Sequence, residues 1–194
     1  MSYIQTTTEE QAAGDVLQMY ERQQARFGYL PNYARVFCYR PDVMASWAAL
    51  LGSIRRHVDP RRFELVTLAA ARALGNIYCS LAHGKALAEL LTMEDAQAMA
   101  NGIGPHTLTD AERVIMSFAG KIARDARTVT AEDISQLRAH GLADDEIFDI
   151  VAVAAARAFF TKVLDGLGAE PDAALQEMDS GLRRALTVDG GAPR

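Results

Sequence analysis

The sequence predicts an all-α fold, and three observations carry this prediction. Apolar residues recur at helical spacing through most of the 194 residues, whereas no segment shows the sustained alternation of a half-buried strand. Alanine, the residue with the highest helix propensity, fills several of these segments. Residues that cap helices recur along the chain at regular intervals. We therefore expect a set of helices packed around a core.

The first half of the chain is expected to form five helices, over residues 9–26, a short stretch from 32, and residues 41–57, 61–74 and 77–91. Thr8 should cap the first helix and Asn32 the second, because their side-chain oxygens can accept a backbone N–H of the first turn. Asp59, followed by a proline, should cap the fourth. Asn76 should cap the fifth, which places Cys79 in its first turn.

The second half is expected to form five more helices, over about residues 93–101, 110–125, 131–140, 144–164 and 171–186. Thr92, Thr109 and Thr130 are their predicted caps, and Glu112 completes a capping box with Thr109. The helix over 144–164 is apolar on most sides, so we expect it at the centre of the fold. Residues 188–194 have the composition of a flexible tail.

An internal repeat would give an alternative architecture of two helical halves. Residues 69–73 and 154–158 share the sequence Ala-Ala-Ala-Arg-Ala, each inside an apolar helix. In this register Leu164 and Gly168 stand where Cys79 and His83 stand in the first copy. A second copy would therefore be structural only.

Composition narrows the class of protein. The formal net charge is −5, which does not favour electrostatic binding to the negatively charged backbone of nucleic acid. No stretch approaches the length of an apolar membrane-spanning helix, and the first residues lack the features of a signal peptide. Only two cysteines are present, Cys38 and Cys79, which is typical of a protein with reduced thiols. We expect a soluble, cytoplasmic protein without a nucleic-acid or membrane partner.

Residues 64–83 contain the chemistry-bearing side chains. Cys79 and His83 are four residues apart, so they share one helical face, where an imidazole can take or return the thiol proton. The first turn of a helix favours the thiolate, the form that attacks a peroxide to give a sulfenic acid. Glu64 is the candidate for the far end of a proton relay. Cys79, His83 and Glu64 are therefore the predicted catalytic residues.

The relay makes a demand on geometry. Glu64 lies eleven residues before Gly75, whereas Cys79 lies four residues after it. At a rise of about 1.5 Å per residue, a strictly antiparallel hairpin leaves Glu64 and Cys79 roughly 10 Å apart lengthwise. The relay therefore requires that the two helices cross at an angle or bend.

The same residues resemble the alkylhydroperoxidase D and carboxymuconolactone decarboxylase families. These families carry a glutamate, a Cys-x-x-Cys motif, and a histidine four positions after the second cysteine. Here the glutamate position is Glu64, the first cysteine position holds Asn76, the second is Cys79, and the histidine is His83. Tyr78 also looks like the family's tyrosine before the second cysteine.

Upstream, residues 28–32 look like the family's Gly-x-x-Pro-Asn loop, so the resemblance covers about residues 28–168. It divides the chain into an N-terminal helix (1–27), a helical domain (28–168), and a C-terminal helix with a flexible tail (169–194). The resemblance implies a helical bundle that forms homo-oligomers. It also implies a hydroperoxide reductase with Cys79 as peroxidatic nucleophile and Glu64 and His83 as its proton relay.

Asn76 departs from the family pattern, because it replaces one thiol of the redox pair. A disulfide within the motif cannot form, so oxidised Cys79 needs an external thiol reductant, or Cys38 if folding brings it near. We expect Tyr78 and Asn76 to line the substrate pocket. No cofactor is expected.

Two other functions fit the sequence. In a carboxymuconolactone decarboxylase-like lyase acting on a small carboxylated metabolite, His83 would be the acid or base and Cys79 would only pack. In a catalytically inactive oligomeric scaffold, the missing first cysteine would mark lost activity. Glu64 could also simply pair with Arg61 or another nearby arginine as a charge on the helix surface.

The other histidines and several aromatic residues are expected to have structural roles rather than roles in the site. No metal site is expected, because no other cysteine or histidine lies close in sequence to Glu64, Cys79 and His83. Surface or capping positions are expected for His57, His106 and His140. Core positions are expected for Tyr29, Phe37 and Trp47.

Overall fold

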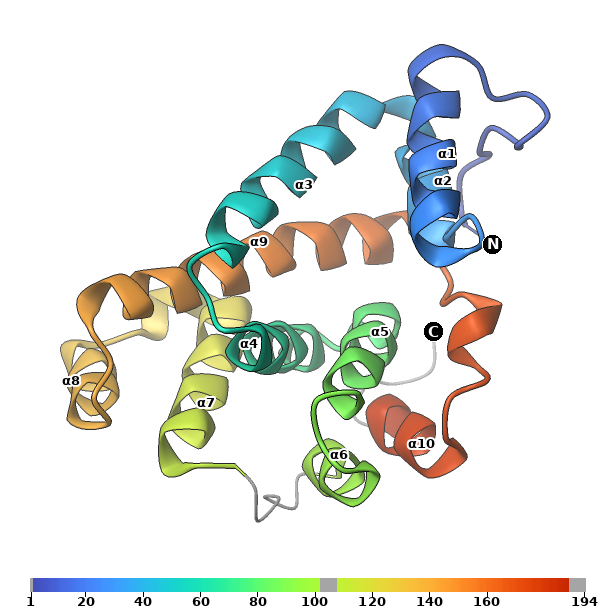
Figure 1. The fold of residues 1–194 in the computed structure, drawn as a ribbon. Coiled ribbons are helices and arrows are strands. Elements are labelled where there is room, and N and C mark those ends of the chain that lie inside the picture. Colours follow the sequence, from blue (N-terminus) through green and yellow to red (C-terminus); the bar gives the residue numbers. More distant parts are fainter. Residues whose placement is uncertain (1, 102–107, 189–194) are drawn as a thin grey trace.

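The computed structural model describes residues 2–101 and 108–188, and across these residues it contains helices and no strand (Figure 1). The predicted all-α fold is confirmed. The helices are α1 (Gly14–Phe27), α2 (Asn32–Val36), α3 (Pro41–Arg55), α4 (Pro60–Ala73), α5 (Ile77–Ala88), α6 (Met93–Ala100), α7 (Asp110–Asp125), α8 (Ala131–Ala139), α9 (Asp144–Leu167) and α10 (Ser180–Val188). Short 3-10 helices cover Phe37–Tyr39, Ala126–Thr128 and Ala173–Leu175.

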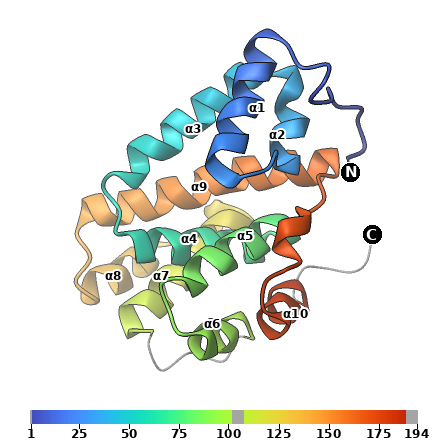
Figure 2. The same ribbon diagram turned by 45° about the vertical axis from the view of Figure 1, so that its right-hand side comes forward.

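Helix α9 lies at the centre, as its apolar sequence predicts. It packs against α2 and α3 on one side and against α4 and α7 on the other (Figures 1 and 2). Ile150, Val153 and Leu164 on this helix are fully buried. Because α9 is buried on both sides, its sequence is apolar around most of the helix circumference.

Two hydrophobic clusters meet at α4. Leu65 and Leu68 of α4 pack into a cluster with α1, α2, α5, α6 and α10. Phe63 and Val66 of the same helix pack into a second cluster with α7, α8 and the first half of α9. Helix α4 is thus buried on both faces, which fixes the position of the polar residue Glu64 that it also carries.

The predicted caps of α4 to α8 are confirmed. The side-chain oxygens of Asp59, Asn76, Thr92, Thr109 and Thr130 each accept a backbone N–H in the first turn of the helix that follows. Thr109 and Glu112 form the predicted capping box. These contacts are local in sequence, which is why the sequence reveals them.

The start of the first helix was predicted wrongly. Helix α1 begins at Gly14 rather than residue 9, and Thr8 does not cap it. The backbone N–H groups of Gln11 and Ala12 donate to the carbonyls of Thr8 and Glu9 and close a separate turn. Gly14 then adopts a left-handed φ of 56°, which interrupts any continuous helix at that point.

The predicted cap at Asn32 is also wrong. Asn32 is the first residue of α2, and its side-chain amide donates to the carbonyl of Glu170 at 3.1 Å. The backbone N–H of Asn32 donates instead to Oδ1 of Asp172, at 2.7 Å. A carboxylate 140 residues away in the sequence therefore stabilises the start of α2.

The predicted helix over 171–186 is divided in two. Asp172 has an extended backbone and is followed by one turn of 3-10 helix, and α10 begins only at Ser180. The carboxylate of Asp179 accepts the backbone N–H of Leu182 at 2.8 Å, so it marks the new helix start. The contacts of Asp172 with distant residues outweigh the local tendency to continue the helix.

Several expectations are not decided by this fold. No helix in residues 2–101 and 108–188 has the length and apolarity needed to cross a membrane, and the cytoplasmic location stays a prediction. His106 and residues 189–194 of the predicted tail lie outside the described residues. The division of the chain at residues 27 and 168, and the origin in two halves, also stay predictions.

Candidate active site

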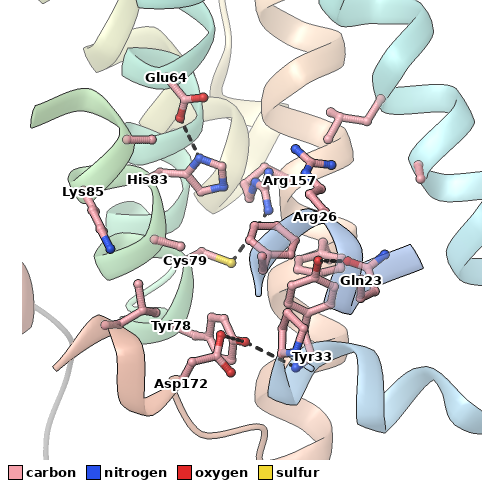
Figure 3. A pocket seen from close by; sticks show the side chains of 18 of the residues that line it. Gln23, Arg26, Tyr33, Glu64, Tyr78, Cys79, His83, Lys85, Arg157 and Asp172 are labelled. Carbon is pink, nitrogen blue, oxygen red and sulfur yellow. Dashed lines mark hydrogen bonds and ion pairs between the residues drawn. The ribbon is translucent and has the colours of Figure 1, made fainter. Parts of the chain in front are cut away.

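A cavity of about 580 Å³ lies between α1, α3, α4, α5, α9 and the segment before α10 (Figure 3). Four of the five predicted site residues line it, namely Glu64, Tyr78, Cys79 and His83. The fifth, Asn76, does not. The folded chain thus brings together residues that lie up to 19 positions apart in the sequence.

Cys79 is the third residue of α5 and is only 2% exposed. Its Sγ accepts a weak hydrogen bond from Nη1 of Arg157 on α9, at 3.8 Å (Figure 3). Burial raises the pKa of the thiol, and this effect outweighs the opposing influence of the Arg157 charge. Burial therefore outweighs the helix-start effect expected from the sequence and favours the thiol form of Cys79 at neutral pH.

Glu64 and His83 form a direct hydrogen bond. Oε2 of Glu64 lies 2.7 Å from Nδ1 of His83, and Oε1 lies 3.9 Å from the guanidinium of Arg55. Burial alone would raise the pKa of Glu64, but the hydrogen bond with His83 and the nearby guanidinium charges together lower it. Glu64 is therefore ionised.

The lengthwise mismatch between Glu64 and Cys79 is resolved by His83. Glu64 precedes Gly75 by eleven residues and His83 follows it by eight, so the residue count from the turn matches Glu64 with His83 better than with Cys79. The two helices also run at an angle to each other (Figures 1 and 2), as the relay requires. Helices α4 and α5 pack directly against each other. His83 reaches Glu64 at one end and lies one helical turn from Cys79 at the other.

The hydrogen bond with Glu64 fixes the proton on His83. Burial and the Arg157 charge lower the pKa of the imidazole, so it is neutral at neutral pH. Because ionised Glu64 can only accept, Nδ1 carries the hydrogen and Nε2 is left with a free lone pair. His83 is thus a neutral base beside a neutral thiol.

Asn76 has a structural position. It is 1% exposed, and its Oδ1 accepts the backbone N–H of Cys79 at 2.7 Å. Its amide nitrogen contacts the carbonyl of Thr161 on α9 at 3.5 Å. The side chain that replaces the family's first cysteine therefore holds the start of α5 rather than lining the pocket as expected.

Tyr78 belongs to a polar cluster at the other end of the cavity. Its hydroxyl donates to Oδ2 of Asp172 at 2.5 Å and accepts the backbone N–H of Tyr33 at 3.3 Å. The Tyr29 hydroxyl also donates to Asp172, at 3.3 Å. Burial and the Asp172 carboxylate raise the pKa of Tyr29 to about 12 and that of Tyr78 further, so both hydroxyls remain donors. Asp172 thus joins the loop before α2 to the start of α5.

Arg157 was missed by the sequence analysis. It is 3% exposed, and its guanidinium lies 5.5 Å from the ring centre of Trp47 and 5.4 Å from that of Phe160. It is the only arginine between residues 147 and 164, in a segment that is otherwise largely apolar. A lone arginine in a central apolar helix was the signal that could have identified it.

Two aromatic residues expected in the core, Tyr29 and Trp47, line the cavity, and Trp47 also packs against the hydrophobic cluster that contains Leu65 and Leu68. Trp47 stacks on Phe160 with ring centres 4.2 Å apart, and its Nε1 donates to the carbonyl of Ala156 at 3.1 Å. Phe37 is buried, as predicted. The cavity therefore has an aromatic wall beside Arg157.

Other side chains fall outside the site. Cys38 is buried and does not line the cavity, and its Sγ accepts the backbone N–H of Thr7 at 3.4 Å. Arg61 pairs with Glu112 at 2.6 Å, and the arginine that pairs with Glu64 is Arg55, at 3.9 Å. His57 and His140 are exposed, as predicted. In the part of the chain that the structure describes, no three His, Cys, Asp or Glu side chains converge as a metal site.

The comparisons with known proteins confirm the resemblance inferred from the sequence. The model of the carboxymuconolactone decarboxylase family matches residues 41–132, the segment that contains Glu64, Cys79 and His83. No curated protein is a significant match to the sequence. Residues 41–132 therefore carry the family's signature, within a fold whose relatives are known from solved structures.

Among those structures is an alkylhydroperoxidase AhpD core, an uncharacterized peroxidase-related protein from Ralstonia eutropha JMP134. It is 22% identical, has a TM-score of 0.78, and the match covers 90% of this chain and 94% of that one. A peroxidase-related protein from Silicibacter sp. TM1040 is 21% identical, with a TM-score of 0.72 and coverage of 89% and 94%. The chain thus has the AhpD-like helical fold.

A third similar structure is that of the debrominase Bmp8, solved as a Cys-to-Ala variant in complex with 2,3,4-tribromopyrrole. It is 16% identical, has a TM-score of 0.76, and the match covers 95% of this chain and all of that one. The fold therefore occurs both in peroxidase-related proteins and in a debrominase.

Proposed function

We propose that this protein is a thiol-dependent hydroperoxide reductase. The observation that carries the proposal is the arrangement of Cys79 in the cavity wall, one helical turn from a neutral His83 whose other nitrogen is bonded to ionised Glu64. A thiol, a neutral base and a carboxylate that orients the base form the pattern of an activated nucleophile.

In the first step, Nε2 of His83 takes the thiol proton while Sγ of Cys79 attacks the outer oxygen of the hydroperoxide. The O–O bond breaks, sulfur gains a hydroxyl as sulfenic acid, and the departing alkoxide receives the proton from His83 as alcohol. Glu64 stabilises the transient imidazolium. Cys79 is oxidised by two electrons and the hydroperoxide is reduced by two.

In the second step, an external thiol reductant restores Cys79. Asn76 supplies no thiol, and Cys38 lies outside the cavity lining. One small thiol condenses with the sulfenic acid and releases water, and a second exchanges with the mixed disulfide to regenerate the Cys79 thiol. This cycle needs no cofactor.

A second candidate function is thiol-dependent dehalogenation. The stacked Trp47 and Phe160 give the cavity a wall suited to a flat aromatic ring, and a debrominase of the same fold binds a brominated pyrrole. Cys79 would take the halogen, the ring carbon would gain a proton, and an external thiol would reduce the sulfenyl halide. Halide release from 2,3,4-tribromopyrrole, with no turnover of hydroperoxide, would favour this reaction.

The direct test is to trap oxidised Cys79. In a Cys38→Ser background, one equivalent of cumene hydroperoxide should give one dimedone adduct, and mass spectrometry should place it at Cys79. His83→Ala should slow the oxidation, and Cys79→Ser should abolish it. An unreactive Cys79 would refute the proposal. If Cys79→Ser spared turnover of a small carboxylated substrate, the lyase function would gain support; inertness toward every substrate would favour the scaffold.

We also propose that the protein forms a homo-oligomer. Phe148 and Phe159 on α9 are 68% and 44% exposed, and Leu50 on the neighbouring α3 is 53% exposed. Exposed large apolar side chains on adjacent helices are typical of a subunit contact. Light scattering should show more than one subunit, and Phe148→Glu should shift the distribution toward monomer.

A further inference from the structure

Arg157 carries a buried charge for which no counterion is described. No carboxylate in residues 2–101 and 108–188 lies within ion-pair distance of its guanidinium, and its Nε has no hydrogen-bond partner among them. Its polar contact is the 3.8 Å approach of Nη1 to Sγ of Cys79, and its other neighbours are the rings of Trp47 and Phe160. A buried guanidinium is costly without an anionic or polar partner.

The nearby acidic groups are already engaged. Glu64 bonds to His83 at 2.7 Å, and Asp172 accepts hydrogen bonds from two tyrosine hydroxyls and a backbone N–H. The Cys79 thiol is uncharged in the resting protein, because burial raises its pKa. Arg157 therefore lines the cavity without a direct ion pair to a described carboxylate, although ionised Glu64 is near enough for the two charges to interact.

The rest of the cavity lining holds three more cations and one more carboxylate. Arg26, Arg55, Lys85 and Glu89 are all exposed residues of the lining, and the excess of positive charge among them attracts an anionic ligand toward the opening. The stacked rings of Trp47 and Phe160 flank the guanidinium and offer an apolar surface. A ligand that matches both features has a flat apolar body and one negative group.

We infer that the substrate carries a carboxylate, which Arg157 binds beside the reacting atom, attached to an apolar or aromatic body that packs on Trp47. A single planar guanidinium suits a planar, singly charged carboxylate. Because Nη1 lies 3.8 Å from Sγ, the carboxylate and the atom attacked by Cys79 must be close neighbours in the molecule. The identity of the reacting atom depends on the proposed function, whereas the binding of an anion by Arg157 does not.

Binding of simple probes tests the anion site without any turnover. The chain has one tryptophan, Trp47, so its fluorescence reports on this cavity alone. Benzoate should change that fluorescence and bind at least about tenfold more tightly than benzamide, its neutral analogue. Loss of the buried charge partner in Arg157→Met should weaken benzoate binding roughly 30-fold or more and leave benzamide unchanged.

Further variants keep this test decisive. Arg157→Lys, which keeps the charge, should retain a preference for benzoate, and Arg157→Gln, which removes the charge but keeps a polar group, replaces Arg157→Met if that protein fails to fold. Arg113→Gln on the surface of α7, where Arg113 pairs with Asp110, is the control for loss of one positive charge and should bind benzoate normally. Equal affinity for the two probes, no benzoate binding, or a preference that survives in Arg157→Met would overturn the inference.

Kinetics separate this inference from the proposed function. With a carboxylated aromatic hydroperoxide, Arg157→Met should raise KM, and by a larger factor than with cumene hydroperoxide. Because Nη1 of Arg157 contacts Sγ of Cys79, kcat should fall for both substrates. An equal change in KM for both substrates would overturn substrate recognition. If benzoate binds as expected but Cys79 fails to react, the reductase proposal fails and the anion site stands.

Discussion

Oε2 of Glu64 lies 2.7 Å from Nδ1 of His83, and this contact joins α4 to α5 on the wall that holds Cys79. The bond determines which imidazole nitrogen is free to accept a proton. The chemical character of the site therefore depends on a carboxylate that need not touch the substrate.

The first prediction concerns this relay. His83→Ala should lower the rate of Cys79 oxidation by hydroperoxide by about 10²–10⁴-fold, the usual contribution of a positioned general base. Glu64→Gln should have a smaller effect, because its amide can still hold the imidazole but no longer fixes the tautomer. Stopped-flow measurement of the second-order rate checks both. The exposed His57→Ala is the matched control and should react like the wild type.

The second prediction is the pH dependence of that rate. Burial lowers the pKa of His83 from its ordinary 6.5, and only the neutral imidazole can take the thiol proton. The wild-type rate should therefore stay level as pH falls from 8 through 6.5 and decline only at more acidic pH. A decline that begins above pH 6.5 would contradict this account.

The His83→Ala protein should behave differently. Without the base, only the thiolate reacts, and burial raises the pKa of Cys79 above its ordinary 9.0. Its rate should climb steadily up to and beyond pH 9, with no level region near neutrality. Iodoacetamide alkylation of Cys79, in a Cys38→Ser background, measures the same ionisation independently of peroxide.

The third prediction concerns stability. Asn76→Ala should lower the free energy of unfolding by about 1–3 kcal/mol, because the buried N–H of Cys79 loses its acceptor. Urea denaturation measures the change. Thr92→Ala, which removes an exposed cap from α6, is the control and should cost about 1 kcal/mol or less. An Asn76 effect no larger than the Thr92 effect would argue against the buried cap.

The fourth prediction restores the motif that Asn76 interrupts. Asn76→Cys places a second thiol three residues before Cys79, at the start of the same helix. After one equivalent of hydroperoxide, this variant should lose both motif thiols and form a disulfide, whereas wild type should retain a sulfenic acid. Mass spectrometry distinguishes the two products. Asn76→Ser, which keeps a capping hydroxyl but adds no thiol, is the control.

The fifth prediction concerns Asp172. Asp172→Ala should destabilise the protein by about 2–4 kcal/mol, because the Tyr78 hydroxyl and the first N–H of α2 lose their acceptor together. At roughly 2–4 °C per kcal/mol for a chain of this size, the thermal midpoint should fall by about 4–16 °C. Tyr78→Phe should cost less, since it removes one donor and leaves the α2 contact intact.

Local features of the sequence predicted much of this fold. The caps at Asp59, Asn76, Thr92, Thr109 and Thr130 and the central position of α9 follow from residues close together in the chain. The failures at α2 and α10 have different causes. The start of α2 depends on Asp172, which lies 140 residues away in the sequence. The start of α10 has a local cap, Asp179, that was overlooked.

The candidate site divides in the same way. Spacing alone placed Cys79 and His83 on one face of a helix, and the hydrogen bond with Glu64 agrees with the predicted relay. Spacing could not reveal Arg157, because its approach to Cys79 spans 78 residues. Spacing also could not reveal that the pKa of the Cys79 thiol is raised, because the burial of Cys79 depends on helices from distant parts of the chain.

The position of Asp172 late in the chain has a consequence for biosynthesis. Asp172 and Leu175 complete the cavity wall, yet Asp172 follows Cys79 by 93 residues. At a synthesis rate of about 5–20 residues per second, the ribosome adds those residues over roughly 5–20 s. During that interval the nascent thiol lacks part of its enclosure, so a newly made chain is more open to indiscriminate oxidants than the finished protein.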